Sequence, residues 1–258
     1  MDSQNLVKQQ FSSTAENYFQ SAVHAQGKDL SDLIILAQQL KPGRVLDLGC
    51  GPGHVSLNLS KEATEVIAYD LSDTMLSVLS RIAEERELKN IVCQKGTVEK
   101  LPFPDQHFDL IVTRFSAHHW LNLQDALHEM RRVLKTNGTI VIIDVTSPSL
   151  AHCDTALQTV EILRDASHVR DYSLKEWHNM ISEAGFNVTH ETSWKLPIEF
   201  ASWIKRINTP INRVEALKVV IDAFPSEVKN YFHFDQSYSF EFDVTWFQMQ
   251  LKITEDFA

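Results

Sequence analysis

The chain of 258 residues has few cysteines, little positive charge and no long apolar run. Its three cysteines, Cys50, Cys93 and Cys153, are widely spaced and form no C-x-x-C pair, which argues against a disulfide framework and against a zinc cluster. An excess of acid, 34 Asp and Glu against 24 Lys and Arg, gives a formal net charge of −10. This balance argues against nucleic acid as a partner, because binding phosphates requires a basic face.

No apolar stretch is long enough to span a bilayer, and the first residues, MDSQNLVKQQF, lack the basic and apolar regions of a signal peptide. Together with the reduced thiols that the cysteine spacing implies, these absences lead us to expect a cytoplasmic protein without a membrane span. The length is sufficient for one large α/β domain with a full core.

The most informative segment is RVLDLGCGPGHVSLNLS at 44–60, where an apolar run containing Asp47 precedes three glycines and an amphipathic stretch. This pattern is typical of strand, tight loop and helix, and such loops bind nucleotide-like cofactors at the helix N-terminus. The glycines follow G-x-G-x-G, whereas dinucleotide loops follow G-x-G-x-x-G, and His54 stands at the final glycine position. Asp47 would oppose a pyrophosphate but would favour a ligand with a positive group.

A second segment, VIAYD at 66–70, ends in Asp70 about twenty residues after the glycines, the separation at which a carboxylate meets ribose hydroxyls. Ribose at one end and a cationic amino-acid group at the other describe S-adenosylmethionine. VLDLGCGPG followed by AYDLS resembles motifs I and II of class I S-adenosylmethionine-dependent methyltransferases. AENYFQSAVHAQGKDL at 15–30 resembles the opening of the methyltransferase type 11 group, which is related to the ubiquinone and menaquinone biosynthesis methyltransferases.

Strand-like and helix-like patterns alternate from Val45 to Val145, which predicts a parallel sheet covered on both faces, with ligands at the carboxyl ends of the strands. The resemblance implies an α/β, Rossmann-like three-layer sandwich. Its seven-stranded sheet is mostly parallel with an antiparallel last strand, and a helical lid lies at the N-terminus. We expect a single domain over 1–258, with the lid at 1–40, the cofactor-binding core at 41–146 and substrate-side helices and last strands at 147–258.

Several boundaries follow from local signals. Helices are expected from about 54, over 74–87 and over 123–134, the last ended by Lys135, Thr136, Asn137 and Gly138. Ser173 and Glu176 form a capping box for a helix that ends at Gly185 and leads into a strand near 187–196. A helical stretch over roughly 200–233 precedes a long final strand in SYSFEFDVTWFQMQLKI.

The resemblance implies that several loops hold the cofactor. Thr97 stands where the family usually has an acid that accepts the adenine amino group, and its hydroxyl is a weaker acceptor. Tyr18 is expected to reach the sulfonium or the methionine carboxylate from the lid, which also contains His24, although Tyr18 could instead fasten its helix to the core. The expected cofactor-binding residues are Asp47, Gly49, Cys50, Gly51, Gly53, Asp70, Leu71, Met75, Thr97, Val98, Arg114 and Tyr18.

The best candidate catalytic segment is TRFSAHHWL at 113–121. His118 or His119 could remove a proton from the substrate nucleophile, since an imidazole titrates near neutral pH. The alternative is that one histidine packs and the other bonds the backbone. A metal site is not expected, because adjacent histidines diverge and no H-x-x-x-H pattern or companion acid accompanies them.

Four residues on the expected substrate side, Arg170, Trp203, Arg206 and Arg213, favour an anionic or aromatic small molecule, unless the arginines lie on a solvated face. The predicted function is S-adenosylmethionine-dependent methyl transfer to a small-molecule acceptor by in-line displacement. A catalytically inactive S-adenosylmethionine-binding protein with a regulatory or structural role remains the alternative, and the oligomeric state stays open.

Overall fold

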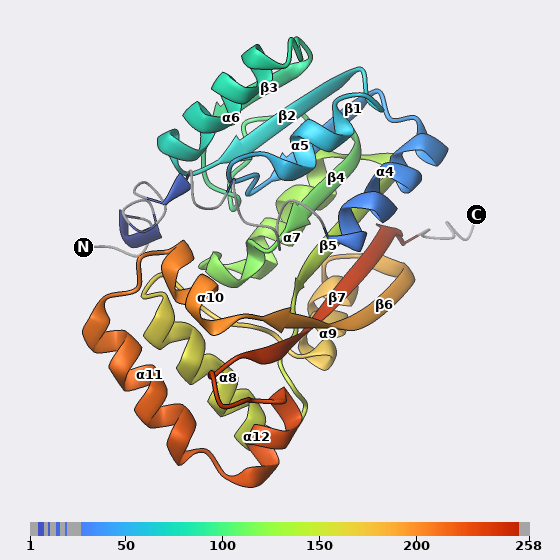
Figure 1. The fold of residues 1–258 in the computed structure, drawn as a ribbon. Helices are drawn as coiled ribbons and strands as arrows, with labels where there is room; N and C mark the ends of the chain where they lie inside the picture. The colour runs from blue at the N-terminus through green and yellow to red at the C-terminus, as the bar shows by residue number, and fades with distance from the viewer. Residues whose placement is uncertain (1–4, 8–9, 11–13, 16–18, 20–26, 253–258) are drawn as a thin grey trace.

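The structure, a computed structural model, describes residues 5–7, 10, 14–15, 19 and 27–252. A seven-stranded sheet with the order β3-β2-β1-β4-β5-β7-β6 forms the middle layer (Figure 1). Its strands are β1 Arg44–Leu48, β2 Glu65–Asp70, β3 Ile91–Lys95, β4 Phe108–Arg114, β5 Leu134–Val145, β6 Phe186–Ile198 and β7 Phe240–Leu251. The first five strands pair in parallel, and β7 runs antiparallel to β5 and β6. This topology confirms the predicted fold class.

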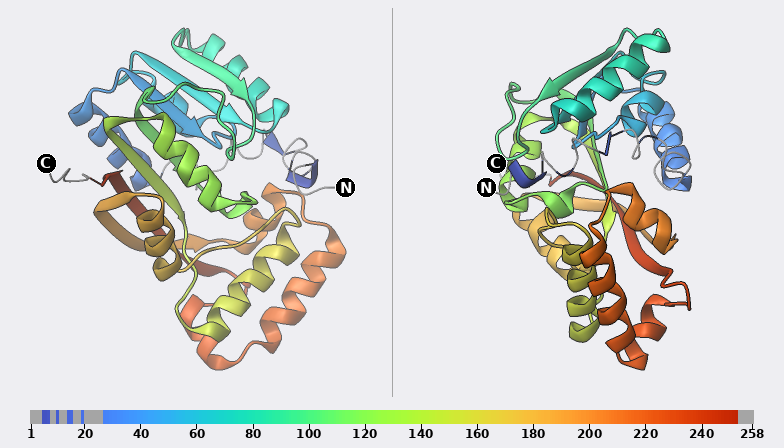
Figure 2. Two further views of the ribbon diagram at one scale, coloured as in Figure 1. Left: turned by 180° about the vertical axis from the view of Figure 1, so that it is seen from behind. Right: turned by 60° about the vertical axis from the view of Figure 1, so that its left-hand side comes forward.

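The helices of the described residues cover both faces of the sheet (Figure 2). They are α4 Lys28–Leu40, α5 His54–Leu59, α6 Asp73–Glu85, α7 Leu123–Val133, α8 Ala151–Arg164, α9 Leu174–Glu183, α10 Phe200–Arg206, α11 Ile211–Ala223 and α12 Ser226–Phe232. The side chains of successive β1 residues lie on opposite faces of the sheet. Val45 packs in one apolar core with α4 and α5, and Leu46 packs in a second one with α7 and α9. The alternation of side chains along a strand therefore builds the three layers.

Helices α8, α10, α11 and α12 form an extension beside β5 and β7, at the end of the sheet where β5 finishes (Figure 1). Their apolar faces share a core with β7 through Trp203, Leu217 and Phe242. The predicted helical stretch over 200–233 is divided into α10, α11 and α12. Pro210 and Pro225 stand at the N-caps of α11 and α12, where a proline begins a new helix because it cannot continue the previous one.

One predicted helix end was wrong. Lys135, Thr136, Asn137 and Gly138 lie within β5 and do not form a loop, because α7 passes directly into that strand at Leu134. The capping box at Ser173 and Glu176 is confirmed, with both reciprocal hydrogen bonds present at the start of α9.

No helix among the described residues has the length and apolar character needed to cross a bilayer. Within the predicted lid region, α4 is helical and packs on the sheet core through Leu33 and Ala37, and a lid role stays a prediction. Tyr18 and His24 lie outside the described residues.

Candidate active site

A cavity lies at the carboxyl ends of β1, β2 and β4, where parallel sheets bind ligands. Most of the predicted cofactor residues line it: Asp47, Gly49, Cys50, Gly51, Asp70, Leu71, Met75, Thr97, Val98 and Arg114. His119 of the predicted catalytic pair also lines it, and so does Val7 from the N-terminal segment. Gly53 and His118 are not among the described lining residues. The sequence analysis did not assign the lining residues His54 and Ser72 to this site, whereas Phe115 and Ser116 lie in the candidate catalytic segment.

The three glycines of the loop all have left-handed backbone conformations, with φ of 70° at Gly49, 52° at Gly51 and 92° at Gly53. A Cβ at Gly49 would lie 2.0 Å from the Ser116 Oγ, and one at Gly53 would lie 2.2 Å from a methyl of Leu79. At Gly51 a Cβ would meet no described atom within 4 Å. Gly49 and Gly53 therefore allow close packing, whereas Gly51 leaves space for a ligand to approach the backbone.

Asp70 joins the end of β2 to the glycine loop. Its Oδ2 accepts a hydrogen bond from the Gly51 backbone N–H at 2.8 Å, and its Oδ1 accepts one from the Ser72 N–H at 2.8 Å. Burial raises the pKa of this carboxyl above its usual value, and the two backbone bonds oppose that shift. Each oxygen retains a further lone pair, so the carboxylate can also accept hydrogen bonds from ligand hydroxyls in the cavity.

Asp47 is 1% exposed, and its Oδ2 accepts hydrogen bonds from the Ser56 backbone N–H at 2.9 Å and from the Ser56 hydroxyl at 2.6 Å. Ser56 lies in the first turn of α5, so Asp47 holds the beginning of that helix. No described residue forms a hydrogen bond with Oδ1 of Asp47. Burial raises the pKa of Asp47 to about 7, and a cation in the cavity would favour its charged form.

Arg114, the last residue of β4, forms an ion pair with Asp29 in the first turn of α4. Both side chains are nearly buried, and the Arg114 Nη2 lies 3.2 Å from the Asp29 Oδ1 alongside a shorter contact through Nε. The pairing neutralises the guanidinium and fastens α4 to the rim of the cavity. Arg114 thus lines the predicted cofactor site while already holding a carboxylate.

The loop after β3 forms another wall, with Thr97 and Val98 in the lining as predicted. The Tyr69 hydroxyl donates a hydrogen bond to the Thr97 carbonyl oxygen at 3.3 Å. A Cβ at Gly96 would lie 1.7 Å from the Tyr69 hydroxyl oxygen, so a glycine is required for this close approach. The tyrosine therefore sets the distance between the loop and β2.

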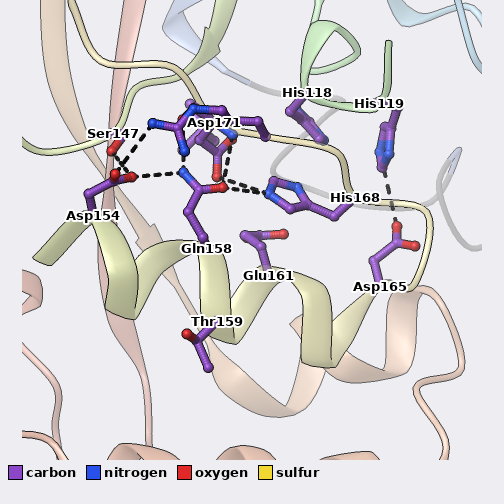
Figure 3. Close-up of polar contacts among 12 residues, drawn as sticks. His118, His119, Ser147, Asp154, Gln158, Thr159, Glu161, Asp165, His168 and Asp171 are labelled. Carbon is purple, nitrogen blue, oxygen red and sulfur yellow. Dashed lines mark hydrogen bonds and ion pairs between the residues drawn. The ribbon is translucent and has the colours of Figure 1, made fainter. Parts of the chain in front are cut away.

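The two candidate catalytic histidines lie on a short 3-10 helix, Ala117–His119 (Figure 3). Their ring centroids are 4.2 Å apart, so the expected divergence of the two side chains was wrong. The His118 Nδ1–H donates to the Asp144 Oδ1 at 2.7 Å, and the Asp144 Oδ2 accepts from the Ala117 N–H at 2.7 Å. Burial alone lowers the pKa of His118, but the Asp144 carboxylate outweighs it and raises the pKa to about 9. His118 is therefore engaged as a cation with Asp144, a partner that the sequence analysis did not identify.

His119 faces the cavity. Its Nδ1 lies 3.2 Å from the Ser167 carbonyl oxygen, and its Nε2 lies 4.0 Å from the Asp165 Oδ2 (Figure 3). Burial and the neighbouring His118 cation lower the pKa of His119 to about 4, so it is neutral near pH 7. Because Nδ1 can only donate to a carbonyl, these contacts assign the hydrogen to Nδ1 and the lone pair to Nε2.

The predicted substrate-side residues do not reach the cavity. Trp203 is 1% exposed and packs against Phe240. Arg170 pairs with Asp154 at 3.4 Å and with Glu176 at 3.1 Å. Neither Arg206 nor Arg213 lies in the described lining. An anionic or aromatic substrate therefore stays a prediction without support from these side chains.

Sequence reasoning also missed a group of buried acids and a histidine beside the 3-10 helix: Asp144, Glu161, Asp165, His168 and Asp171. Asp144 carried a usable signal, because it stands near the end of an apolar strand, as Asp47 and Asp70 do. The other four lie in α8 or in the irregular segment after it, where no spacing marks them.

Comparisons with known proteins agree with this geometry. The family described as "Methyltransferase domain" matches residues 46–142. YafE of Escherichia coli is 41% identical over 196 residues, covering 76% of this chain and 95% of YafE. The uncharacterized methyltransferase YcgJ of Bacillus subtilis is 38% identical over 222 residues, covering 86% of this chain and 88% of YcgJ. The crystal structure of YcgJ superimposes with a TM-score of 0.82 at 34% identity, covering 88% of this chain and 99% of YcgJ.

The ubiquinone/menaquinone biosynthesis C-methyltransferase UbiE of Azotobacter vinelandii is 38% identical over 112 residues, covering 42% of this chain and 44% of UbiE. The residues that match the family, 46–142, contain the glycine loop, Asp70 and the two histidines. The chain therefore belongs to the class I S-adenosylmethionine-dependent methyltransferases and is an enzyme with S-adenosylmethionine as its cofactor.

Proposed function

We propose that this enzyme transfers the methyl group of S-adenosylmethionine to a small-molecule acceptor by in-line displacement. The observation that carries the proposal is that one cavity is lined by Asp47, Asp70 and His119. Two carboxylates suited to a cationic nucleoside thus share a cavity with an imidazole that is neutral near pH 7. The acidic chain, with a net charge of −10, supports a small acceptor over a nucleic acid.

The described residues fit the cofactor. When bound, S-adenosylmethionine supplies an electrophilic methyl group on its sulfonium and departs as S-adenosylhomocysteine. Asp70 would accept the ribose hydroxyls, and the free Oδ1 of Asp47 would accept from the α-ammonium group. The open side of Gly51 admits the ligand to the backbone, and Thr97 and Val98 would lie beside the adenine. Gly53 would act indirectly, by allowing the loop to pack against Leu79.

We assign the acceptor side of the cavity to His119. Its Nε2 carries the lone pair and can take the proton that an O–H, N–H or C–H acceptor loses when its new bond to carbon forms. The imidazolium formed in this way would lie 4.0 Å from the Asp165 carboxylate, which would stabilise it. His118 has a positioning role, because its pairing with Asp144 holds the turn from which His119 projects.

A transfer assay with a matched pair of variants tests this assignment. We would incubate the protein with methyl-labelled S-adenosylmethionine and low-molecular-mass fractions of a cell extract, then compare His119→Gln with His128→Gln. His128 is an exposed histidine on α7, so its loss should leave transfer unchanged. Loss of a general base should lower transfer by about 10²- to 10⁴-fold while S-adenosylhomocysteine binding persists. Binding without transfer to any fraction would favour the inactive alternative.

A further inference from the structure

A second polar group combines His118 of the 3-10 helix, Asp144 near the end of β5 and Asp171 of the segment after α8. Figure 3 shows His118 and Asp171. One ligand atom from each of His118, Asp144 and Asp171 lies within 4.8 Å of the others. Their side chains are 15%, 2% and 1% exposed, respectively. An imidazole nitrogen and two carboxylate oxygens that converge in this way form a donor set suited to divalent first-row transition metals.

Asp171 provides an independent indication of a missing cation. Its Oδ2 accepts no hydrogen bond from any described residue, although its side chain is almost completely buried. The His168 Nε2 lies 3.9 Å away, but this nitrogen donates to the Gln158 Oε1 at 3.0 Å. Burying a carboxylate oxygen without a donor is costly, so an unpaired one requires an explanation.

Other acceptors in the same region also lack donors. With Nε2 of His168 donating to Gln158, its Nδ1 is the acceptor, and no described residue bonds to it. The Asp165 Oδ2 likewise accepts no hydrogen bond from the described residues. With the Asp171 Oδ2, three acceptor atoms of this region thus accept no hydrogen bond from the described residues.

The balance of charge leads to the same conclusion. Asp144, Glu161, Asp165 and Asp171 contribute four buried carboxyl groups. The cations that act on them include His118, which pairs with Asp144, Arg164, whose Nη1 lies 3.9 Å from Glu161, and Arg206, whose charge lowers the pKa of Glu161. The four carboxyls outnumber these three cations by one, and a divalent ion that replaces the proton of His118 adds one positive charge.

We propose that the protein binds one divalent transition-metal ion, of the Mn²⁺ to Zn²⁺ series, between His118, Asp144 and Asp171. The ion takes the place of the proton on His118, so its binding releases a proton. It joins the end of β5 to the segment after α8, and so fixes the wall that carries His119. The site does not depend on methyl transfer, and an ion-binding measurement tests it separately.

Calorimetric titration of the chelator-treated full chain with Mn²⁺ and Zn²⁺ tests the proposal. We expect one ion per chain, with an affinity that falls at least about 100-fold in Asp171→Asn, because that change removes a ligand. Asp154→Asn is the matched control: it removes a carboxyl from α8 that bonds Gln158 and Arg170 but is outside the converging set. It should retain the ion.

S-Adenosylhomocysteine binding by Asp171→Asn shows whether that variant is folded. If it does not fold, anomalous scattering from Mn²⁺-soaked crystals of the unaltered protein decides, with a peak expected among the three side chains. The proposal is overturned if neither ion binds, if Asp171→Asn binds as the unaltered protein does, or if the anomalous peaks lie only elsewhere.

Discussion

Replacing Asp47 with asparagine removes one charge from the cofactor cavity while retaining the size of the side chain. The amide oxygen can still accept from the Ser56 N–H, now 2.9 Å from the Asp47 Oδ2, and the Ser56 hydroxyl can rotate toward another acceptor. The free energy of unfolding should therefore fall by no more than about 1.5 kcal/mol, the net value of one hydrogen bond. Binding should respond far more strongly, because the variant leaves the α-ammonium of the ligand without its buried counter-charge.

Loss of one member of a buried charge pair costs about 2–5 kcal/mol, which corresponds to a Kd about 30-fold to several thousand-fold higher. Calorimetric titration with S-adenosylmethionine and S-adenosylhomocysteine measures this directly. Both ligands carry the ammonium group, so both should weaken to a similar extent. Asp73→Asn is the control, since its carboxylate is 72% exposed and pairs with Lys95 outside the cavity. It should bind both ligands normally.

The pH dependence of binding supplies a second measurement on the same residue. Burial raises the pKa of Asp47 to about 7, so the carboxyl becomes protonated as the pH falls below that value. The ligand requires the ionised form, so affinity should fall about tenfold for each pH unit below 7 and become constant above it. Asp47→Asn should abolish this slope. A variant affinity within threefold of the original, or an unchanged slope, would refute the assignment of the ammonium to Asp47.

Three further predictions concern the loop, the adenine wall and a helix cap. Gly51→Ala should lower the free energy of unfolding by about 1–2 kcal/mol, because an alanine is strained in the left-handed conformation of Gly51. It should also weaken S-adenosylmethionine binding in calorimetry. Gly53→Ala should unfold at a clearly lower urea concentration, because its Cβ would lie 2.2 Å from a methyl of Leu79. Thr97→Asp restores the acid typical of the family and should tighten cofactor binding up to about tenfold. Ser173→Ala should lower the free energy of unfolding by about 1 kcal/mol in urea titration, since it removes half of the capping box of α9.

The core of the fold could be predicted because two kinds of signal agree there. Apolar strands alternate with amphipathic helices from β1 to β5, and the acids near the strand ends meet at one edge, as parallel pairing requires. Asp47 and Asp70 could therefore be placed in one site from the sequence. The passage of α7 directly into β5 could not, because Lys135 and Gly138 carry a turn signal that the pairing of β4 with β5 overrides.

The roles of the two histidines were only half accessible to sequence reasoning. Adjacent residues on a 3-10 helix project about 120° apart, which favours divergence, but the two rings lie with their centroids 4.2 Å apart. Which ring faces the cavity depends on Asp144, on a strand that follows in the chain, and on Ser167 and Asp165 in an irregular segment. Long-range pairing of this kind leaves no periodic trace in the sequence.

A common arrangement links Asp47, Asp70 and Asp144. Each lies at or near the carboxyl end of its strand and accepts a hydrogen bond from a backbone N–H of another element: Ser56 in α5, Gly51 in the loop and Ala117 in the 3-10 helix, respectively. These bonds hold the elements around the cavity, and they leave other lone pairs of the same carboxylates available. Asp47 is buried and Asp70 half-buried at one edge of the sheet, so their carboxylates concentrate negative potential there, whereas Asp144 is paired with His118. The scaffold of the site thus also favours a ligand with sulfonium and ammonium charges over a pyrophosphate.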